Sequence, residues 1–224
     1  MIRSPFLRCF AEQGCQPMHR MAKPVLCLQQ KNVVHLFCLF QVQKNGIIAY
    51  YIERVEEMKT AKNIAKLTEK MIKFYDGDLH DINHFLKVYG YAKTIGQCEG
   101  LDEMSQMSLE AAAIVHDIAC PLCREKYGSA DGKHQEQEGP ALTIPFLKGS
   151  GLHQACVGRV VYLVGHHHTP EKVDGPDYQI LLEADYLVNA GEGNYTREHI
   201  EQAMEKLFKT ETGKSFLRSI YLKN

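Results

Sequence analysis

The chain has 224 residues, which is enough for one domain with a sizeable buried core. Its hydrophobic fraction of 45% and charged fraction of 24% are typical of a soluble globular protein. With 26 basic and 27 acidic side chains the formal net charge is −1, so no overall field favours stable binding of nucleic acid or of an anionic membrane. Eleven histidines are more than chance would supply at this length.

The cysteines and the N-terminal sequence indicate the cellular compartment in which the protein is expected. A chain with a full core does not need disulfides, so we expect its eight cysteines to be reduced thiols and the protein to be cytoplasmic. The first 24 residues contain arginines but lack the continuous apolar stretch of a signal peptide. The most apolar window, Val33–Val42, is too short to span a bilayer.

Residues 1–57 do not show the helical spacing of apolar residues that the rest of the chain shows. They are expected to form an N-terminal extension, which is either irregular or contains a hairpin. Two β-leaning runs, 33–42 and 47–55, are joined by a segment that ends in Asn45-Gly46, and Asn-Gly between such runs predicts a β-hairpin over 33–55. These runs could also pair between two chains in a homodimer. Alternatively, the native protein starts at Met58 and the upstream part is not native.

From residue 58 onward the apolar period is helical, and residues 58–224 are expected to form one all-α domain. A first helix ends at the break 76–78, Asp81 can cap a second helix, and Asp102 or Ser105 can start a third that Pro121 ends. Residues 120–133 read as a loop. Further helices are expected at about 135–148, 152–167, 177–190 and 196–210.

Histidine and aspartate recur at helix positions where burial is costly unless they are paired. His116-Asp117 ends an apolar helix, and Asp185 lies in a nearly all-apolar one. His84 lies on a helix among apolar neighbours, so its ring can point inward. Taken singly, each has a structural explanation, as a satisfied core histidine or a buried ion pair. Taken together, imidazole and carboxylate groups in this number favour a site for a divalent transition metal.

Further histidines could complete the set. His134 precedes an expected helix, where a solvated loop residue is the alternative. His166, His167 and His168 end another apolar helix. Adjacent residues on a helix point about 100° apart, so at most two of these three can bind one metal, and a neighbour could contact substrate.

The ordered set His84, His116-Asp117 and Asp185 resembles the H…HD…D motif of the HD-domain metal-dependent phosphohydrolase superfamily. The resemblance covers roughly residues 59–210, and the stretch 162–189 looks like small bacterial members. It implies an HD-type helical bundle in which these four residues bind one metal. His134 and one or two of His166 and His167 would then complete a second site, with Asp117 shared between the two metals.

The resemblance also implies a reaction, namely cleavage of a phosphate ester or anhydride of a nucleotide or another small phosphorylated metabolite. One or two ions of Fe, Mn, Zn, Co or Ni would lower the pKa of bound water from about 15.7 toward 7. Asp117 and His134 are the expected catalytic residues. Two alternatives stay open: a di-iron oxygenase with much the same ligands, and a non-catalytic, metal-stabilised nucleotide-binding module.

Candidate substrate ligands are His168 and four cations, each of which has a solvated surface as its alternative. The cations are Lys87, Arg124, Lys126 and Lys133. Two departures from relatives matter. Cys120 occupies a place where several relatives have lysine, and the Gly-Tyr-Pro element of cyclic-dinucleotide enzymes is absent, which argues against a cyclic-di-GMP enzyme. Cys120 and Cys123 are expected to pack the loop rather than bind zinc.

Overall fold

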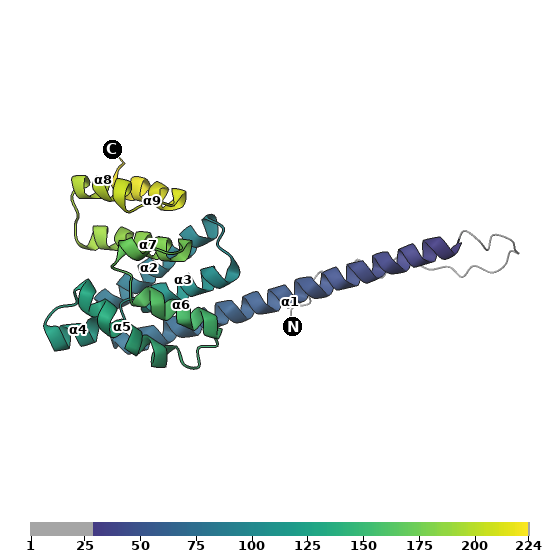
Figure 1. The fold of residues 1–224 in the computed structure, drawn as a ribbon, viewed down its shortest axis with the longest axis horizontal. Coiled ribbons are helices and arrows are strands. Elements are labelled where there is room, and N and C mark those ends of the chain that lie inside the picture. The colour runs from purple at the N-terminus through teal and green to yellow at the C-terminus, as the bar shows by residue number, and fades with distance from the viewer. Residues whose placement is uncertain (1–28, 224) are drawn as a thin grey trace, which may run out of the picture. The chain divides into compact units, whose positions relative to one another are not determined.

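The computed structural model describes residues 29–223, with only the backbone described at 29–48, 52, 53 and 56. This part of the chain contains nine α-helices, one short 3-10 helix and no strand, which confirms the all-α class (Figure 1). The helices are α1 Gln29–Tyr75, α2 Leu79–Cys98, α3 Glu103–Val115, α4 Cys120–Tyr127, α5 Gly132–Leu147, α6 Gln154–Val164, η2 Pro170–Lys172, α7 Pro176–Glu192, α8 Arg197–Lys206 and α9 Glu211–Tyr221.

The predicted hairpin at 33–55 is wrong, because these residues belong to the continuous helix α1. Short apolar runs do not distinguish strand from helix, and Val33, Phe37 and Phe40 also follow helical spacing. Gly46 inside a helix costs only about 1 kcal/mol relative to alanine. The chain divides into two units, residues 1–53 and 54–224, of which the second contains every residue described below. The expected irregular segment 1–32 lies mostly outside the described residues, so that expectation and the predicted boundary at residue 58 stay predictions.

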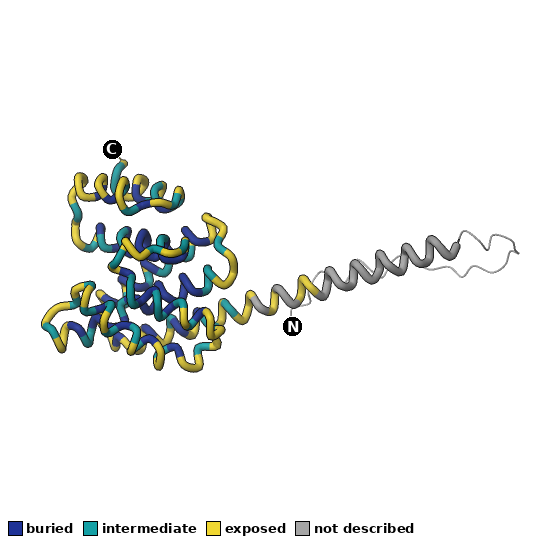
Figure 2. Tube along the Cα trace, viewed as in Figure 1, coloured by how far each residue is buried: buried dark blue, intermediate teal, exposed yellow. Residues whose placement is uncertain are grey.

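The core of the second unit is built around two helices that are buried on nearly every side. Residues 108–115 of α3 are all buried, and so is most of α7. α2 packs against both of them, and α6 packs against α3. Figure 2 shows the buried residues concentrated where these helices face one another. A helix that is apolar all round belongs in such a position, so a polar group on α3 or α7 needs a partner there.

The buried face of α2 explains why one histidine points inward. Phe85, Val88, Ala92 and Ile95 recur at helical spacing and are fully buried, and His84 lies on the same face. Asp78 caps this helix by accepting a hydrogen bond from the backbone N–H of Asp81, so the predicted cap at Asp81 is wrong. The predicted start of α3 is confirmed, because Asp102 caps this helix as expected.

The end of α3 differs from the prediction in a way that matters for the site. α3 ends at Val115, and a tight turn at residues 116–119 leads into α4. Pro121 therefore lies in the first turn of α4 rather than ending α3, a position where its missing N–H costs nothing. The predicted loop over 120–133 is wrong because α4 and the start of α5 fill most of it.

The C-terminal part contains the helix predicted at about 196–210, observed as α8, and a further helix, α9, that was not predicted. Thr196 caps α8 and Thr210 caps α9, each with its hydroxyl oxygen accepting from a backbone N–H. Between them, Phe208 is buried against the core. Among the described residues, none of the helices is both long and apolar enough to cross a membrane.

Candidate metal centre

Four of the predicted ligands come from three buried elements. His84 projects from α2, His116 and Asp117 follow the end of α3, and Asp185 projects from the middle of α7. The turn after α3 is what places two ligands in succession at one point. Because α2, α3 and α7 pack against one another, the side chains converge inside the bundle rather than on its surface.

The donor atoms of these residues lie close together. His84 Nε2 lies 3.2 Å from His116 Nε2, 3.2 Å from Asp185 Oδ1 and 3.4 Å from Asp117 Oδ2. His116 Nε2 lies 3.5 Å from Asp117 Oδ2 and 3.6 Å from Asp185 Oδ1. Two ligands in a tetrahedral shell with bonds of about 2.0–2.1 Å are separated by about 3.3–3.4 Å. The spacing of the donors therefore matches a cation-sized hole.

Hydrogen bonds fix the orientation of the two rings. The Nδ1–H of His84 donates to Glu192 Oε2 at 2.9 Å, and the Nδ1–H of His116 donates to the carbonyl oxygen of Ala113 at 3.0 Å. Each bond leaves Nε2, the atom that faces the cluster, with a free lone pair in the neutral imidazole. Metal-binding histidines nearly always have such a carboxylate or carbonyl partner.

A second group shares Asp117 with the first. His167 Nε2 lies 3.4 Å from Asp117 Oδ1, the oxygen opposite the one that faces His84 and His116. Donor atoms of Asp117, His167 and His168 lie within 4.8 Å of one another. The Nδ1–H of His167 donates to a backbone carbonyl at 2.9 Å, so this ring too directs Nε2 toward the carboxylate. The two oxygens of Asp117 therefore face two separate donor groups.

Within the two donor groups, two buried atoms have no hydrogen-bond partner among the described residues. They are His167 Nε2 and Asp185 Oδ1. A buried polar atom without a partner is costly, and most such atoms in native proteins are satisfied. Both atoms face the cluster. With their imidazole and carboxylate chemistry, the residues present fit a divalent transition metal, and a metal bound in each donor group would give both atoms a partner.

The charge state of the cluster agrees with a cation site. Burial alone would raise the pKa of Asp117, but interactions with His116 and His167 outweigh it and hold that pKa below its usual range. Burial likewise raises the pKa of Asp185, but interactions with His116 and His84, whose Nε2 atoms lie 3.6 Å and 3.2 Å from its Oδ1, outweigh burial and keep that pKa low. Burial lowers the pKa of His84, and the two carboxylates raise it to a net value of about 9. The cluster thus contains two largely buried carboxylates that stay ionised. A divalent cation bound beside them would balance their charge and would displace protons from the neighbouring histidines.

The structure does not bring every predicted ligand to the cluster. His134 lies in the first turn of α5, with its ring stacked on Tyr127 at 3.9 Å between centroids and its Nδ1 3.2 Å from Asp131 Oδ1. His166 stacks on Tyr162 at 4.3 Å and donates from Nδ1 to the carbonyl of that residue. Among the described residues, neither histidine belongs to a donor group. Their predicted roles stay predictions.

His168, rather than the predicted His166, joins His167 and Asp117 in the second donor group. It was predicted to contact substrate, but its ring lies beside His167, with centroids 4.0 Å apart, and belongs to the donor group on Asp117. Gly132, at the start of α5, allows this placement because a Cβ there would lie 2.5 Å from the His168 ring. The backbone N–H of His168 also donates to Glu136.

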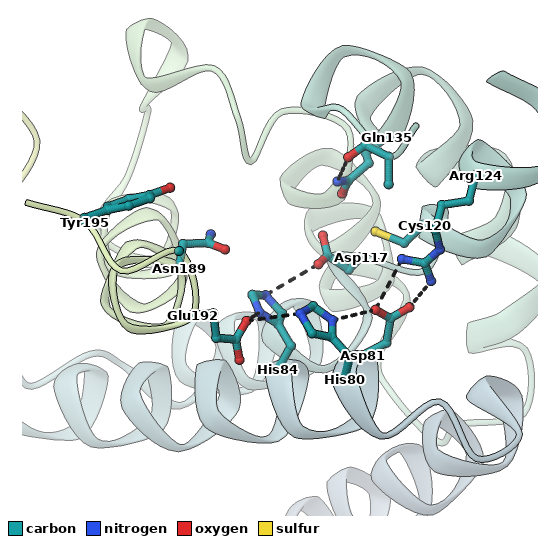
Figure 3. Close-up of a pocket in the computed structure, with 12 residues that line it drawn as sticks. His80, Asp81, His84, Asp117, Cys120, Arg124, Gln135, Asn189, Glu192 and Tyr195 are labelled. Carbon is teal, nitrogen blue, oxygen red and sulfur yellow. Dashed lines mark hydrogen bonds and ion pairs between the residues drawn. The ribbon is translucent and has the colours of Figure 1, made fainter. Parts of the chain in front are cut away.

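A pocket of about 340 Å³ opens beside the first donor group (Figure 3). His84 and Asp117 line it next to the cluster, and Arg124 and Gln135 line it from the side of α4 and α5. Asn189 and Tyr195 line it from the end of α7 and the following loop. The donor group is therefore open to a small molecule rather than sealed in the core.

The four predicted cations are placed as follows. Arg124 forms a two-bond pair with Asp81 at the edge of the pocket. The other three are exposed and do not line it: Lys87 donates to Glu192 at 2.9 Å, Lys126 donates to Glu138 at 2.8 Å, and Lys133 lies in the first turn of α5.

Sequence reasoning missed Glu192 and left Asn189 outside the predicted site, although helical spacing places both on the face of Asp185. They lie seven and four residues after Asp185, so all three share one face of α7. It also missed Gln135, a buried amide whose Nε2 donates to the carbonyl of Ala130 and whose Oε1 has no partner among the described residues. No spacing in the sequence distinguishes that glutamine from the others around it.

Two other polar or reactive groups have structural roles. Glu183, two residues before Asp185 on α7, is fully buried and accepts hydrogen bonds from the backbone of Lys209 and Thr210, so it anchors the start of α9. Cys120 lines the pocket, and burial raises the pKa of its thiol, which keeps it protonated. The four cysteines with described side chains are free.

No protein-family model matches this sequence, and no curated protein matches it. Among solved structures, the chain is similar to a predicted HD superfamily hydrolase from an uncultured Thermotogales bacterium. The two are 24% identical with a TM-score of 0.51, and the match covers 72% of this chain and 84% of that one. At this identity the likeness concerns the fold. The chain therefore has the HD-domain fold, as the resemblance of its motifs predicted.

Proposed function

We propose that this protein is a metal-dependent phosphohydrolase that cleaves a phosphate ester or anhydride of a nucleotide or another small phosphorylated metabolite. The observation that carries the proposal is the convergence of four donor atoms, 3.2–3.6 Å apart in the measured pairs, beside an open pocket. The structural neighbour, a predicted HD superfamily hydrolase, supports the same proposal.

Each ligand has a place in this proposal. His84, His116, Asp117 and Asp185 would hold one divalent ion, and Asp117, His167 and His168 would hold a second. When bound, such metals acidify water at neutral pH and polarise a phosphoryl oxygen. Iron, manganese, cobalt, nickel and zinc all accept these ligands.

The protein's own residues supply orientation and shielding. Glu192 holds the His84 ring so that its Nε2 faces the cluster. The buried residues of α3 and α7 surround the donors and keep bulk water from the side opposite the pocket. Asn189 lines the pocket next to the cluster, where its amide can hydrogen-bond a substrate. A catalytic role for His134 remains part of the proposal and would require its ring to leave Tyr127.

The test joins metal analysis to a phosphatase screen without oxygen, in the presence of Mn, Co, Fe, Ni or Zn. Wild type is expected to hold metal and release phosphate, and Asp117→Ala is expected to lose both. Asp174→Ala is a matched control, since Asp174 is an aspartate paired with Arg159 away from the cluster. Equal metal content in wild type and Asp117→Ala would refute the ligand assignment. Turnover that requires iron and oxygen would instead identify an oxygenase.

A further inference from the structure

The one arginine beside the candidate metal centre is already neutralised. Among the residues that line the pocket, Arg124 is the single lysine or arginine. Its Nη1 donates to Asp81 Oδ1 at 3.3 Å, its Nη2 donates to Asp81 Oδ2, and Asp78 Oδ2 lies 3.6 Å away. Figure 3 shows this pair at the edge of the pocket. Asp81 is only 6% exposed, so turning the guanidinium toward a phosphate would leave this buried carboxylate with the exposed His80, 3.2 Å away, as its remaining side-chain partner.

Carboxylates outnumber cations around the pocket. Asp81, Asp117 and Glu192 all line it. Both oxygens of Glu192 accept hydrogen bonds, Oε2 from His84 Nδ1 and Oε1 from Lys87, each at 2.9 Å, which is the contact pattern of a carboxylate. Lys87 donates to Glu192 at 2.9 Å and does not line the pocket. Apart from bound metal, the lining therefore carries net negative charge.

The remaining predicted phosphate ligands do not change this balance. Lys126 donates to Glu138 at 2.8 Å, and neither residue lines the pocket. Lys133 is exposed and is also outside the lining. Within the described lining of the pocket, the paired Arg124 is thus the one lysine or arginine that a phosphate chain extending from the cluster could meet.

The wall opposite Arg124 is aromatic rather than basic. Tyr195 lines the pocket, and its ring is held by Tyr186 at 5.7 Å and His199 at 4.6 Å between centroids. Gly193 makes room for that ring, because a Cβ there would lie 2.6 Å from it. A rigid tyrosine at the mouth of a pocket favours the flat or apolar part of a ligand over a chain of phosphates.

We propose that this site selects esters that carry a single phosphate group and disfavours di- and triphosphates. This proposal rests on the phosphohydrolase function proposed above and narrows its substrate class. The phosphate that reacts lies against the bound metal, which offsets its charge. Each further phosphate adds negative charge that faces Asp81 and Glu192 with no free cation to receive it, and such like-charge contacts reject a ligand. The modest pocket volume of about 340 Å³ agrees with a compact ester.

The direct test compares the mono-, di- and triphosphates of each common nucleoside with wild-type protein at a fixed free concentration of Mn²⁺. We expect kcat/KM for the monophosphate to exceed that for the triphosphate by at least about 100-fold. Inhibition of p-nitrophenyl phosphate hydrolysis by phosphate, pyrophosphate and tripolyphosphate should follow the same order. A triphosphate cleaved as well as its monophosphate would overturn the inference and leave the phosphohydrolase proposal intact. Failure to hydrolyse any phosphate ester would instead refute both.

A variant then tests whether the Asp81 carboxylate and its pairing with Arg124 cause this selectivity. Asp81→Asn removes one carboxylate charge and weakens the hold on Arg124, so the triphosphate-to-monophosphate ratio of kcat/KM should rise roughly tenfold. Asp174→Asn is the matched control, because Asp174 pairs with Arg159 through the same two-bond geometry away from the pocket, and its ratio should equal that of wild type. An unchanged ratio in folded Asp81→Asn would overturn the inference. If that variant does not fold, the wild-type ranking decides alone.

Discussion

The two donor groups that share Asp117 are built differently. In the first, His84, His116 and Asp185 come from buried helices or a helix end, and the measured distances between donors span only 3.2–3.6 Å. In the second, His167 and His168 come from the turn after α6, and the His168 side chain is exposed. Packed helices carry His84 and Asp185 of the first group, whereas both histidines of the second group lie in a turn. We therefore expect a tight first metal site and a weaker second one.

The largest effect should come from removing the carboxylate that both groups share. Asp117→Asn keeps the size of the side chain but replaces one charged oxygen with an amide nitrogen, which cannot bind a metal. Both metals should be lost, and hydrolysis should fall to background. Metal content by mass spectrometry checks this. Retention of one full equivalent would show that the groups do not share Asp117 as a bridge.

The next prediction distinguishes the metal affinities of the two donor groups. Asp185→Asn removes a buried ligand of the first group alone and should abolish the tight site, whereas His168→Ala should remove only the weaker site. Titration with Co²⁺, followed by its visible absorption, reports the two affinities. If His168→Ala weakens the tighter site as much as Asp185→Asn does, the predicted ranking of the two sites is wrong.

A smaller effect is expected from Glu192, which contacts the metal ligand His84 rather than the metal itself. Glu192→Gln keeps a hydrogen bond to His84 but removes the charge that holds the ring, so metal affinity at the first site should fall roughly 10–100-fold. Glu138→Gln is the control, because Glu138 pairs with Lys126 and does not line the pocket. An affinity unchanged by Glu192→Gln would assign Glu192 a purely structural role.

The smallest effect concerns the turn that carries the second group. In Gly132→Ala the added Cβ would lie 2.5 Å from the His168 ring and should displace it, so only the weaker metal affinity should drop. Gly158→Ala meets open space inside α6 and should leave both affinities unchanged while stabilising the fold by about 0.5–1 kcal/mol. Equal metal affinities in the two variants would show that His168 does not depend on this close approach.

The sequence predicted the tightly built region best. His84 and Asp185 were identified because each lies on the buried face of a strongly periodic helix, where a polar side chain needs a partner. The same reasoning could not place His134, His166 and His168, because their directions are set by turns and by stacking on Tyr127 and Tyr162. Loop and turn geometry is a property of tertiary packing and leaves no period in the sequence.

The fold shows the same contrast. The helices from 58 to 118 were predicted nearly in full, whereas the hairpin at 33–55 was wrong because a short apolar run fits helix or strand equally well. Helix α4 was missed because Pro121 was taken as a stop, although proline is equally at home in the first turn of a new helix. Gln135 and Tyr195 line the pocket through contacts that only the folded chain creates.

The central claim is that His84, His116, Asp117 and Asp185 together hold one divalent ion. Anomalous diffraction from crystals of the protein loaded with Mn²⁺ or Co²⁺ tests it most directly. The predicted result is a strong anomalous peak about 2.0–2.2 Å from donor atoms of all four residues. A loaded crystal whose metal lies elsewhere, with these four side chains ordered and facing no peak, would contradict it.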